Sequence, residues 1–276
     1  MIGELRTVHL MGALRRKGHD LSEDALRAEW TSVDRIKRAA EPPLVRTARA
    51  FFRDQEREVL SRLPVVLEGR APKARKDPFI VSQLIDMATW LREVELRFGQ
   101  PVLQAIERGF DIGLSRVSVT GVDFTSDAPQ VRISLSEILN KTKEMNATTA
   151  DQLGRLIQDH LSSGATIGDI ERSVREMFED WQGWRADTVA QTAATGGFES
   201  GQQNAFEEAE IDDKRWLSQR DGRVRVTHLE ADGQQVSIRE SFIVGKASLK
   251  HPGDPAGPAG EVIRCRCTSI PVIRSE

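Results

Sequence analysis

Apolar residues recur every three or four positions through most of the first 210 residues, and this spacing constrains the fold more than any other feature of the chain. The clearest apolar row comprises Ile80, Leu84, Met87, Leu91, Val94 and Phe98. An amphipathic α-helix buries one face with this period, whereas a strand alternates with a period of two. The sequence therefore predicts a chain that is mostly helical.

Residues 22–63 carry two apolar rows, one on each side of Pro42-Pro43. Because consecutive prolines remove amide donors, we predict two antiparallel helices here. Residues 69–77 contain no apolar residue larger than Ala or Pro, so we place a domain boundary after residue 76. Residues 1–76 then form a basic N-terminal helical region, with these residues on its outer faces: Arg35, Lys37, Arg38, Arg46, Arg49, Arg53 and Arg57.

The helical middle region, residues 77–148, begins with a well-delimited helix. Asp77 can cap its first amides and Pro78 suits its first turn, while Gly99 and Pro101 favour its end. We expect three further features in this region: a short helix over 101–110, irregular or short-strand structure over 117–131, and a helix start at Ser134-Leu-Ser-Glu137.

Three more helices are predicted within residues 149–211. Thr149 begins the first, which ends at Gly164. Thr166-Ile-Gly-Asp169 has the pattern of a capping box and begins the second, which ends at Trp181 and Trp184. The third runs from about residue 185 to about 210 and is expected to be weakened or kinked at Gly196-Gly197.

The pattern changes to short segments and turn residues at Asp212. Asp232-Gly233 between alternating segments indicates a hairpin. Residues 251–260 contain three prolines and three glycines, which favour a shaped loop without regular structure. The predicted fold class is therefore α+β: a mostly α-helical body with a small C-terminal mixed or β-hairpin module over residues 212–276.

The charge of the chain is unevenly distributed, although the net formal charge is only −3. Residues 1–76 hold 17 basic and 11 acidic residues, whereas residues 77–180 hold 10 and 17. A basic N-terminal region is compatible with an acidic partner or nucleic acid, but also with an ordinary solvated helix surface. The lack of interleaved aromatic residues favours the solvated surface.

Several classes of protein lack support in the sequence. Charges interrupt every apolar stretch, so no segment reaches the roughly 18 apolar residues of a membrane-spanning helix, and we expect no membrane association. The start of the sequence lacks the apolar core of a secretory signal, which predicts a cytoplasmic chain. No P-loop, dinucleotide fingerprint, His-Glu-x-x-His or Gly-x-Ser-x-Gly motif occurs.

The C-terminal third carries an ordered set of motif residues: Trp216, Asp221, Arg225, His228, Asp232, Gly233, Pro252, Gly253, Asp254, Pro255, Cys265 and Cys267. Their order and spacing resemble the phage Mu protein F-like family of head morphogenesis proteins, also called minor capsid proteins. The helical segments at 166–170 and 185–204 also resemble that family. The resemblance covers residues 149–275 and defines the third predicted domain, residues 149–276.

The chain departs from the family pattern at three places. Gln191 replaces the usual Arg, and Ala194 stands where the family commonly has Glu. The Cys-x-x-Cys that many members carry before the histidine is absent, and residues 223–227 occupy that stretch.

Cys265 and Cys267 are the only cysteines and are separated by one residue, so they cannot form a disulfide that joins distant segments. In a strand both would project to the same side and could face His228. Zinc prefers four ligands, and His251 or Asp221 could complete the set. The alternative is two small buried thiols beside a hydrogen-bonded core histidine. We favour this alternative and assign no cofactor, because a single Cys-x-Cys lacks the second close pair of a zinc ribbon.

A catalytic site is the second alternative for these residues. Asp221, Arg225, His228, Asp232 and Asp254 include an acid, a base and an anion-binding group. However, Asp232 before Gly233, and Asp254 between Gly253 and Pro255, are also turn-forming residues. We favour the structural role and expect no enzyme.

The resemblance implies a virion structural protein present in few copies, located near the portal vertex, that assists head assembly or genome delivery. Its partners would be the portal or other head proteins, and it would occupy the host cytoplasm during assembly. The basic N-terminal region is the candidate for docking onto an acidic portal or scaffold surface, or onto packaged DNA. The alternatives are a virion-carried nuclease or transferase-like effector that uses His228, and a host-encoded helical adaptor.

Overall fold

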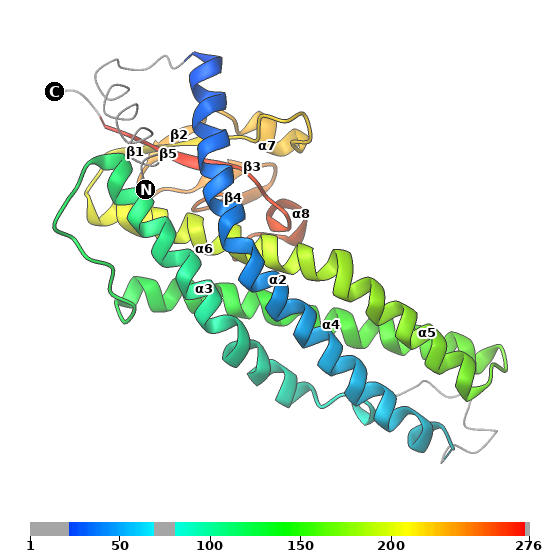
Figure 1. Ribbon diagram of the computed structural model, residues 1–276. Coiled ribbons are helices and arrows are strands. Elements are labelled where there is room, and N and C mark those ends of the chain that lie inside the picture. The colour runs from blue at the N-terminus through cyan, green and yellow to red at the C-terminus, as the bar shows by residue number, and fades with distance from the viewer. Residues whose placement is uncertain (1–21, 69–80, 274–276) are drawn as a thin grey trace. The chain divides into compact units, whose positions relative to one another are not determined.

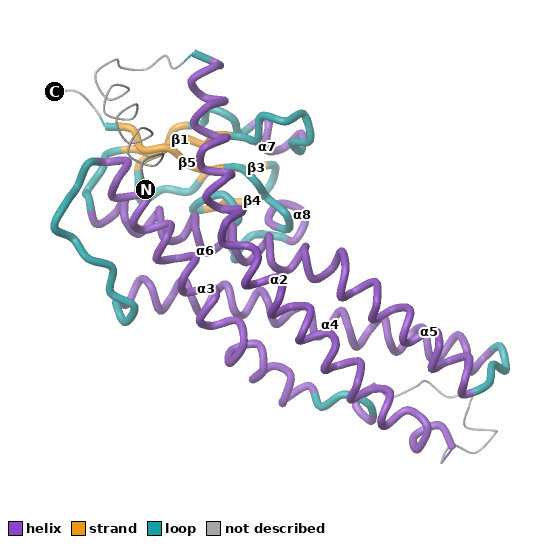
Figure 2. The backbone as a smooth tube through the Cα atoms, in the orientation of Figure 1, coloured by secondary structure: helices purple, strands orange, loops and turns teal. Residues whose placement is uncertain are grey.

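The computed structural model describes residues 22–68 and 81–273, which are mostly helical (Figures 1 and 2). The long helices are α2 (Glu23–Glu68), α3 (Met87–Val117), α4 (Pro129–Ser162), α5 (Ile167–Asp180) and α6 (Ala186–Glu208). The short helices are η2 (Val81–Gln83), η3 (Trp181–Arg185), α7 (Val226–Glu230) and α8 (Ala259–Val262). None of the helices in the described ranges combines the length and the apolar character needed to cross a bilayer.

Two small antiparallel sheets lie near the C-terminal end of the chain. The first has the strand order β2 (Gln235–Ser237), β1 (Asp213–Leu217), β5 (Thr268–Val272), with Arg215 opposite both Gln235 and Ile270. The second pairs β3 (Phe242–Val244) with β4 (Ala247–Leu249). The predicted α+β class, mostly helical with a small C-terminal mixed module, is confirmed.

The chain divides into two compact units that are not contiguous in sequence. The helical unit comprises residues 43–99 and 139–190. The strand-bearing unit comprises residues up to 42, 100–138 and 191 onward, and contains all the described strands. Helices α2, α3, α4 and α6 each contribute residues to both units.

Aromatic rings form the core of the helical unit. The Phe51 ring lies edge to face with Trp90 and Phe98 at centroid distances of 4.9 and 5.8 Å. Phe178 and Trp181 pack in the same way at 4.7 Å, and the Arg185 guanidinium lies 4.5 Å from the Trp181 ring. Offset and edge-on ring pairs of this kind add to the stabilisation from burial. This unit is therefore held mainly by apolar packing.

Glycines allow α3 and α6 to approach closely within the strand-bearing unit. A Cβ atom at Gly201 would clash with the carbonyl oxygen of Ile106, and one at Gly109 would clash with that of Phe198. A Cβ atom at Gly197 would lie 2.9 Å from the Cβ of Ala105. Gly196-Gly197, which the sequence suggested as a kink, therefore belongs to a continuous helix that uses small residues for packing.

Pro42-Pro43 does not end a helix, so the predicted antiparallel pair is wrong: α2 runs from Glu23 to Glu68 as one element. Val33 and Leu44 are both buried, and eleven residues make about three turns, so they share one face. Continuous burial of this face offsets the amide hydrogen bonds that proline removes. The prolines instead coincide with the passage of α2 from one unit to the other.

The second predicted stop is also wrong, because α3 continues through Gly99 and Pro101 to Val117. Its described start is capped by the Asp86 carboxylate, which accepts hydrogen bonds from the amides of Ala88 and Thr89. Asp77, Pro78 and the linker over residues 69–77 lie outside the described residues. Residues 101–110 are part of α3. Of the two alternatives for residues 117–131, the irregular one is confirmed over 118–128, and no strand forms there.

The sequence predicted helix starts at Ser134 and Thr149, but both residues lie inside α4. The Thr149 hydroxyl donates a hydrogen bond to the carbonyl of Met145, one turn earlier in the helix. A capping threonine would instead accept a hydrogen bond from a backbone amide of the following turn. The capping box of Thr166 and Asp169 is confirmed. The non-helical residue near α6 is Gly183, with φ −85° and ψ −107°, rather than Gly196-Gly197.

The hairpin was predicted at the wrong place. Residues 218–234, which include α7, connect β1 to β2, and Asp232-Gly233 is a turn before β2. The tight hairpin joins β3 to β4 through Gly245-Lys246, where Gly245 has φ +59°. The loop over 251–260 is irregular as expected until Ala259, where α8 begins. The domain boundaries at 76/77 and 148/149 stay predictions; the first lies outside the described residues and the second within α4.

Candidate functional site

His228, Cys265 and Cys267 converge in the interior of the strand-bearing unit. His228 lies on α7, and both cysteines lie in the loop between α8 and β5; each residue is 1% exposed. The Nδ1 atom of His228 lies 3.3 Å from the Cys267 sulfur and 3.8 Å from the Cys265 sulfur. The strand predicted for these two cysteines does not form, yet both sulfurs reach the histidine.

The opposite side of the imidazole is also occupied. His228 Nε2 lies 3.0 Å from a Glu261 carboxylate oxygen, which accepts a 2.8 Å hydrogen bond from the Thr227 hydroxyl. The Trp216 ring packs edge to face against the imidazole, with centroids 5.5 Å apart. These contacts fix the plane of the ring and direct Nδ1 toward the two sulfurs.

The three groups perturb one another's titration. Burial opposes protonation of His228, but the hydrogen bond and charge of Cys265 outweigh it and raise the pKa of the imidazole. The hydrogen bond from Cys267 holds the pKa of Cys265 well below its usual value, assisted by His228. Burial, together with Cys265, raises the pKa of Cys267. One thiol is therefore poised to become a thiolate beside an imidazolium.

This cluster is the one group of three or more His, Cys, Asp or Glu side chains in residues 22–68 and 81–273 whose ligand atoms could hold a metal ion. Its potential ligand atoms all lie within 4.8 Å of one another. His251 does not join it, because its ring nitrogens bond to Ser200 Oγ at 3.2 Å and to the Pro252 carbonyl at 3.1 Å. Asp221 is engaged in an ion pair with Arg266 at 2.6 Å.

Asp232 and Asp254, two of the carboxylates considered as catalytic groups, accept hydrogen bonds from backbone amides. Asp232 accepts a 2.7 Å hydrogen bond from the Ser218 amide and pairs with Arg220 at 2.8 Å. Asp254 accepts from the amides of Lys250 and Ala256 at 2.7 and 2.9 Å. Within the described ranges, neither carboxylate joins His228 in a cluster.

Four motif residues, Arg225, Gly233, Gly253 and Asp221, have structural partners or backbone roles. Arg225 donates to the Ile263 carbonyl. Gly233 and Gly253 have φ of +78° and +72°, which favour glycine. Burial opposes ionisation of Asp221, but hydrogen bonds from Gln219, Arg223 and Arg266 lower its pKa.

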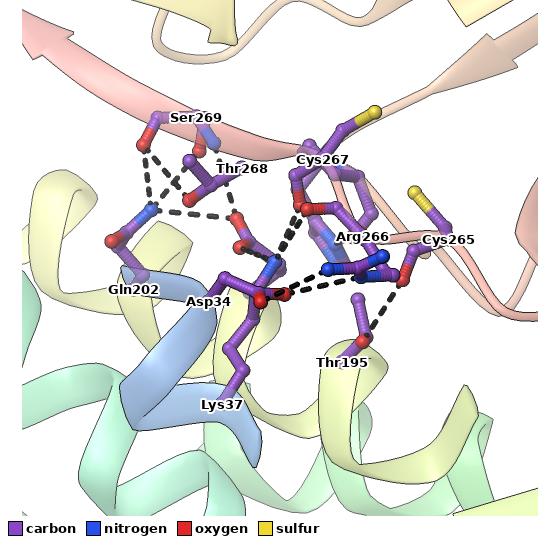
Figure 3. Close-up of polar contacts among 12 residues, drawn as sticks. Asp34, Lys37, Thr195, Gln202, Cys265, Arg266, Cys267, Thr268 and Ser269 are labelled. Atoms are coloured by element: carbon purple, nitrogen blue, oxygen red, sulfur yellow. Dashed lines mark hydrogen bonds and ion pairs between the residues drawn. The ribbon is translucent and has the colours of Figure 1, made fainter. Parts of the chain in front are cut away.

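Lys37 of α2 bonds to the loop that carries the two cysteines (Figure 3). Its side chain is buried, so its predicted place on an outer face is wrong. Its ammonium donates to the Cys267 carbonyl at 2.6 Å and to a Glu199 oxygen at 3.1 Å. The other Glu199 oxygen accepts from the Ser269 amide at 3.2 Å. Figure 3 shows the loop's carbonyls facing these partners and its sulfurs pointing away from them.

Helix α6 contributes further supports that the sequence analysis missed. Thr195 donates to the Cys265 carbonyl at 3.0 Å, and Gln202 donates to the Ser269 carbonyl at 2.9 Å. Gln191, one of the departures from the family pattern, accepts from Arg264 at 3.1 Å and so retains a polar role. The available signal was the mixed Ala, Gly and Gln composition of residues 186–208, which lacks a clear polar face and so indicates burial on several sides.

A second buried ion pair supports β5. Arg116 of α3 pairs with Glu29 of α2 and donates to the Ser269 carbonyl at 2.9 Å. Buried charges of this kind need partners, because an unpaired ion in the interior is costly. The strand that follows the cysteine loop is therefore fixed by charged groups from α2, α3 and α6.

Comparisons with known proteins agree with the resemblance noted in the sequence. Residues 151–270 match the family described as Phage Mu protein F like protein. The chain is also similar to NAD(+)--arginine ADP-ribosyltransferase EFV of Enterococcus faecalis, with 26% identity over 246 residues, 80% of this chain and 50% of the relative. It therefore spans half the length of that relative. No solved structure matches the chain. This match supports, for residues 151–270, the resemblance to the phage Mu protein F-like family.

Proposed function

We propose that this chain is a structural minor capsid protein that joins the phage head during assembly and contacts the portal or another head protein. The observation that carries this proposal is the family match over residues 151–270. That segment includes α5 to α8 and all but the last residues of β5. On the same match we propose that the chain associates with the virion and passes through the host cytoplasm during assembly.

The contacts of the motif residues support a structural role for the module rather than a catalytic one. Asp232, Asp254 and Arg225 bond to backbone atoms of neighbouring turns. Such bonds rigidify loops without presenting free acids or bases to a substrate. A rigid module that presents defined loops suits an assembly contact.

The N-terminal helix offers a candidate docking face within the helical unit. Arg46, Arg49, Arg53 and Arg57 of α2 are exposed and lie three or four residues apart, so they share one face. Arg49 and Arg57 pair with Asp187 and Asp54. Arg46 and Arg53 form no ion pair with any described residue. We propose that this face meets an acidic surface of a head protein, or packaged DNA.

The experiment is to purify heads from a phage that encodes an epitope-tagged copy of this chain. We expect the tagged chain to sediment with heads and to cross-link to the portal or another head protein. The double variant Arg46→Glu/Arg53→Glu should lower its amount in heads several-fold, because like charges repel. Arg155→Glu, a charge reversal on the exposed face of α4, is the matched control and should leave incorporation unchanged. Normal heads that lack the chain would contradict the proposal.

DNA binding is tested separately with the purified chain. If Arg46 and Arg53 contact phosphates, affinity for duplex DNA should fall steeply between about 50 and 200 mM salt, because counterions are released. Binding that is flat over this range would exclude the electrostatic contact with DNA and leave the acidic head protein as the partner.

An enzyme remains the second candidate, and one observation favours it: the relative from Enterococcus faecalis is named as an arginine ADP-ribosyltransferase. The assay uses labelled NAD+ and an arginine-rich acceptor protein. A structural protein should transfer no label, and His228→Ala should lower stability without changing turnover. Label transfer that His228→Ala abolishes in a folded variant would instead establish the enzyme.

A further inference from the structure

We propose that His228, Cys265 and Cys267 bind one zinc ion, which joins α7 to the loop before β5. The sequence alone favours an unligated cluster, because the cysteine pair has no second pair nearby. In the folded chain the third ligand comes from α7, 37 residues before Cys265. The sequence suggested that His228 could face both sulfurs, and the folded chain shows that it does.

The distances fit a tetrahedral ion. With Zn–S bonds of about 2.3 Å and Zn–N bonds of about 2.0 Å, a tetrahedral site places the nitrogen and a sulfur about 3.5 Å apart. The two observed separations, 3.3 and 3.8 Å, lie on either side of this value. Small side-chain rotations would therefore suffice to complete the coordination.

Glu261 supplies the outer support that metal-bound histidines usually have. Its carboxylate lies 3.0 Å from His228 Nε2 and can accept the proton of that nitrogen. This hydrogen bond selects the tautomer whose Nδ1 carries a free lone pair toward the sulfurs. A carboxylate behind the ring also makes the imidazole a stronger ligand.

Charge balance favours the same assignment. Two thiolates and Zn²⁺ form a neutral group, which is compatible with the nearly complete burial of both cysteines. Each thiol loses its proton when it binds zinc. If both thiols and the imidazole are neutral before binding, about two protons should leave the chain for each zinc bound.

The fourth position does not come from the residues proposed in the sequence analysis, because His251 and Asp221 bond elsewhere. Three protein ligands leave one position for water. Soft thiolates with imidazole select zinc over magnesium or calcium. The ion would brace two loops of the module whatever partner the module meets, so this inference is independent of the proposed function.

The test measures metal in the full-length chain after purification and after removal of metal by a chelator. We expect about one zinc per chain. Zinc added back to the stripped chain should raise the melting temperature and release protons, as measured by calorimetry in buffers of different ionisation enthalpy. Cobalt should bind the same site and give the absorption of a thiolate-ligated tetrahedral ion. Cys265→Ser and Cys267→Ser should each lower zinc affinity at least tenfold.

His160→Gln is the matched control, because this histidine of α4 lies in the other unit and should leave zinc content unchanged. Glu261→Gln should weaken binding by about tenfold, since only the outer hydrogen bond changes. The proposal is overturned if the folded, stripped wild-type chain shows no thermal shift and takes up less than about 0.1 equivalents of zinc. Zinc that is bound equally by Cys265→Ser and by the wild type would overturn it as well.

Discussion

The two compact units of this chain are stabilised in different ways. The helical unit packs aromatic rings around Phe51, and Arg185 is the one charged residue among its buried described positions. The strand-bearing unit buries several charged side chains, which the ion pairs Lys37–Glu199 and Arg116–Glu29 exemplify. Apolar packing tolerates small adjustments, whereas a buried ion requires its partner. The strand-bearing unit should therefore be the more sensitive to single polar substitutions.

Lys37→Met is expected to have the largest effect. It leaves Glu199 buried without its cation, so the free energy of unfolding should fall by about 3–5 kcal/mol. Glu199→Gln in addition should recover more than half of the loss, because the amide still accepts from the Ser269 amide. Urea unfolding of the single and double variants measures both values. If the double variant is less stable than Lys37→Met, the loss of the Lys37–Glu199 ion pair does not explain the destabilisation.

Phe51→Ala should cost a similar amount, about 3–5 kcal/mol, through a cavity in the helical unit. Hydrogen exchange should then accelerate first in residues 43–99 and 139–190, whereas Lys37→Met should accelerate it first in the strand-bearing unit. Val65→Ala is the matched control on the same helix, because Val65 is 73% exposed. Its effect should stay below about 0.5 kcal/mol. Identical exchange patterns for Phe51→Ala and Lys37→Met would remove the distinction between the units.

Lys214 makes the stability of the strand-bearing unit depend on pH. Burial lowers the pKa of its ammonium from 10.5 to about 8, although Nζ donates to Gln203 at 3.1 Å and to the Lys250 carbonyl at 2.7 Å. Between these two pKa values the unfolded chain binds the proton and the folded chain does not, so the free energy of unfolding rises with pH. The wild type should gain roughly 3 kcal/mol relative to Lys214→Met from pH 7.5 to 10.5.

The control for this titration is Lys246→Met, which removes an exposed lysine of the β3–β4 turn. Because this side chain is exposed, its removal should change the free energy of unfolding by less than about 0.5 kcal/mol at each pH that is measured. A difference between the wild type and Lys214→Met that is flat across the same range would show that Lys214 titrates normally.

The sequence predicted which types of secondary structure form better than it predicted where the helices end. The helical period, the capping box at Thr166 and the change at residue 212 all correspond to structural features. The predicted breaks at Pro42-Pro43 and Pro101 were wrong, because they rest on local backbone preferences. Burial of one continuous helix face outweighed those preferences. The punctuating residues mark the passage between units instead.

The candidate site was predicted in part. His228, Cys265 and Cys267 follow from the motif, but the residues that hold their loop do not. A charged residue in an amphipathic helix normally faces solvent, and nothing local to Lys37 indicates a partner 162 residues away. The useful signal lay in α6, where Glu199 stands in a helix that is buried on several sides and so requires a cation.

The smallest predicted effect compares two helical glycines. At Gly201 an added methyl group meets the carbonyl of Ile106 and the amide of Phe110, which are backbone atoms that cannot rotate away. Helices α3 and α6 must then separate, so Gly201→Ala should lower the free energy of unfolding by about 1–3 kcal/mol. At Gly99 the same methyl group meets nothing within 4 Å. Gly99→Ala should therefore stabilise the chain by about 0.5–1 kcal/mol, since alanine loses less backbone entropy in a helix. Thermal unfolding of both variants gives the comparison. If the two substitutions change the free energy of unfolding with opposite signs, close backbone contact, rather than helix propensity, determines where this chain keeps glycine. If both changes have the same sign, the close approach of α3 and α6 is refuted.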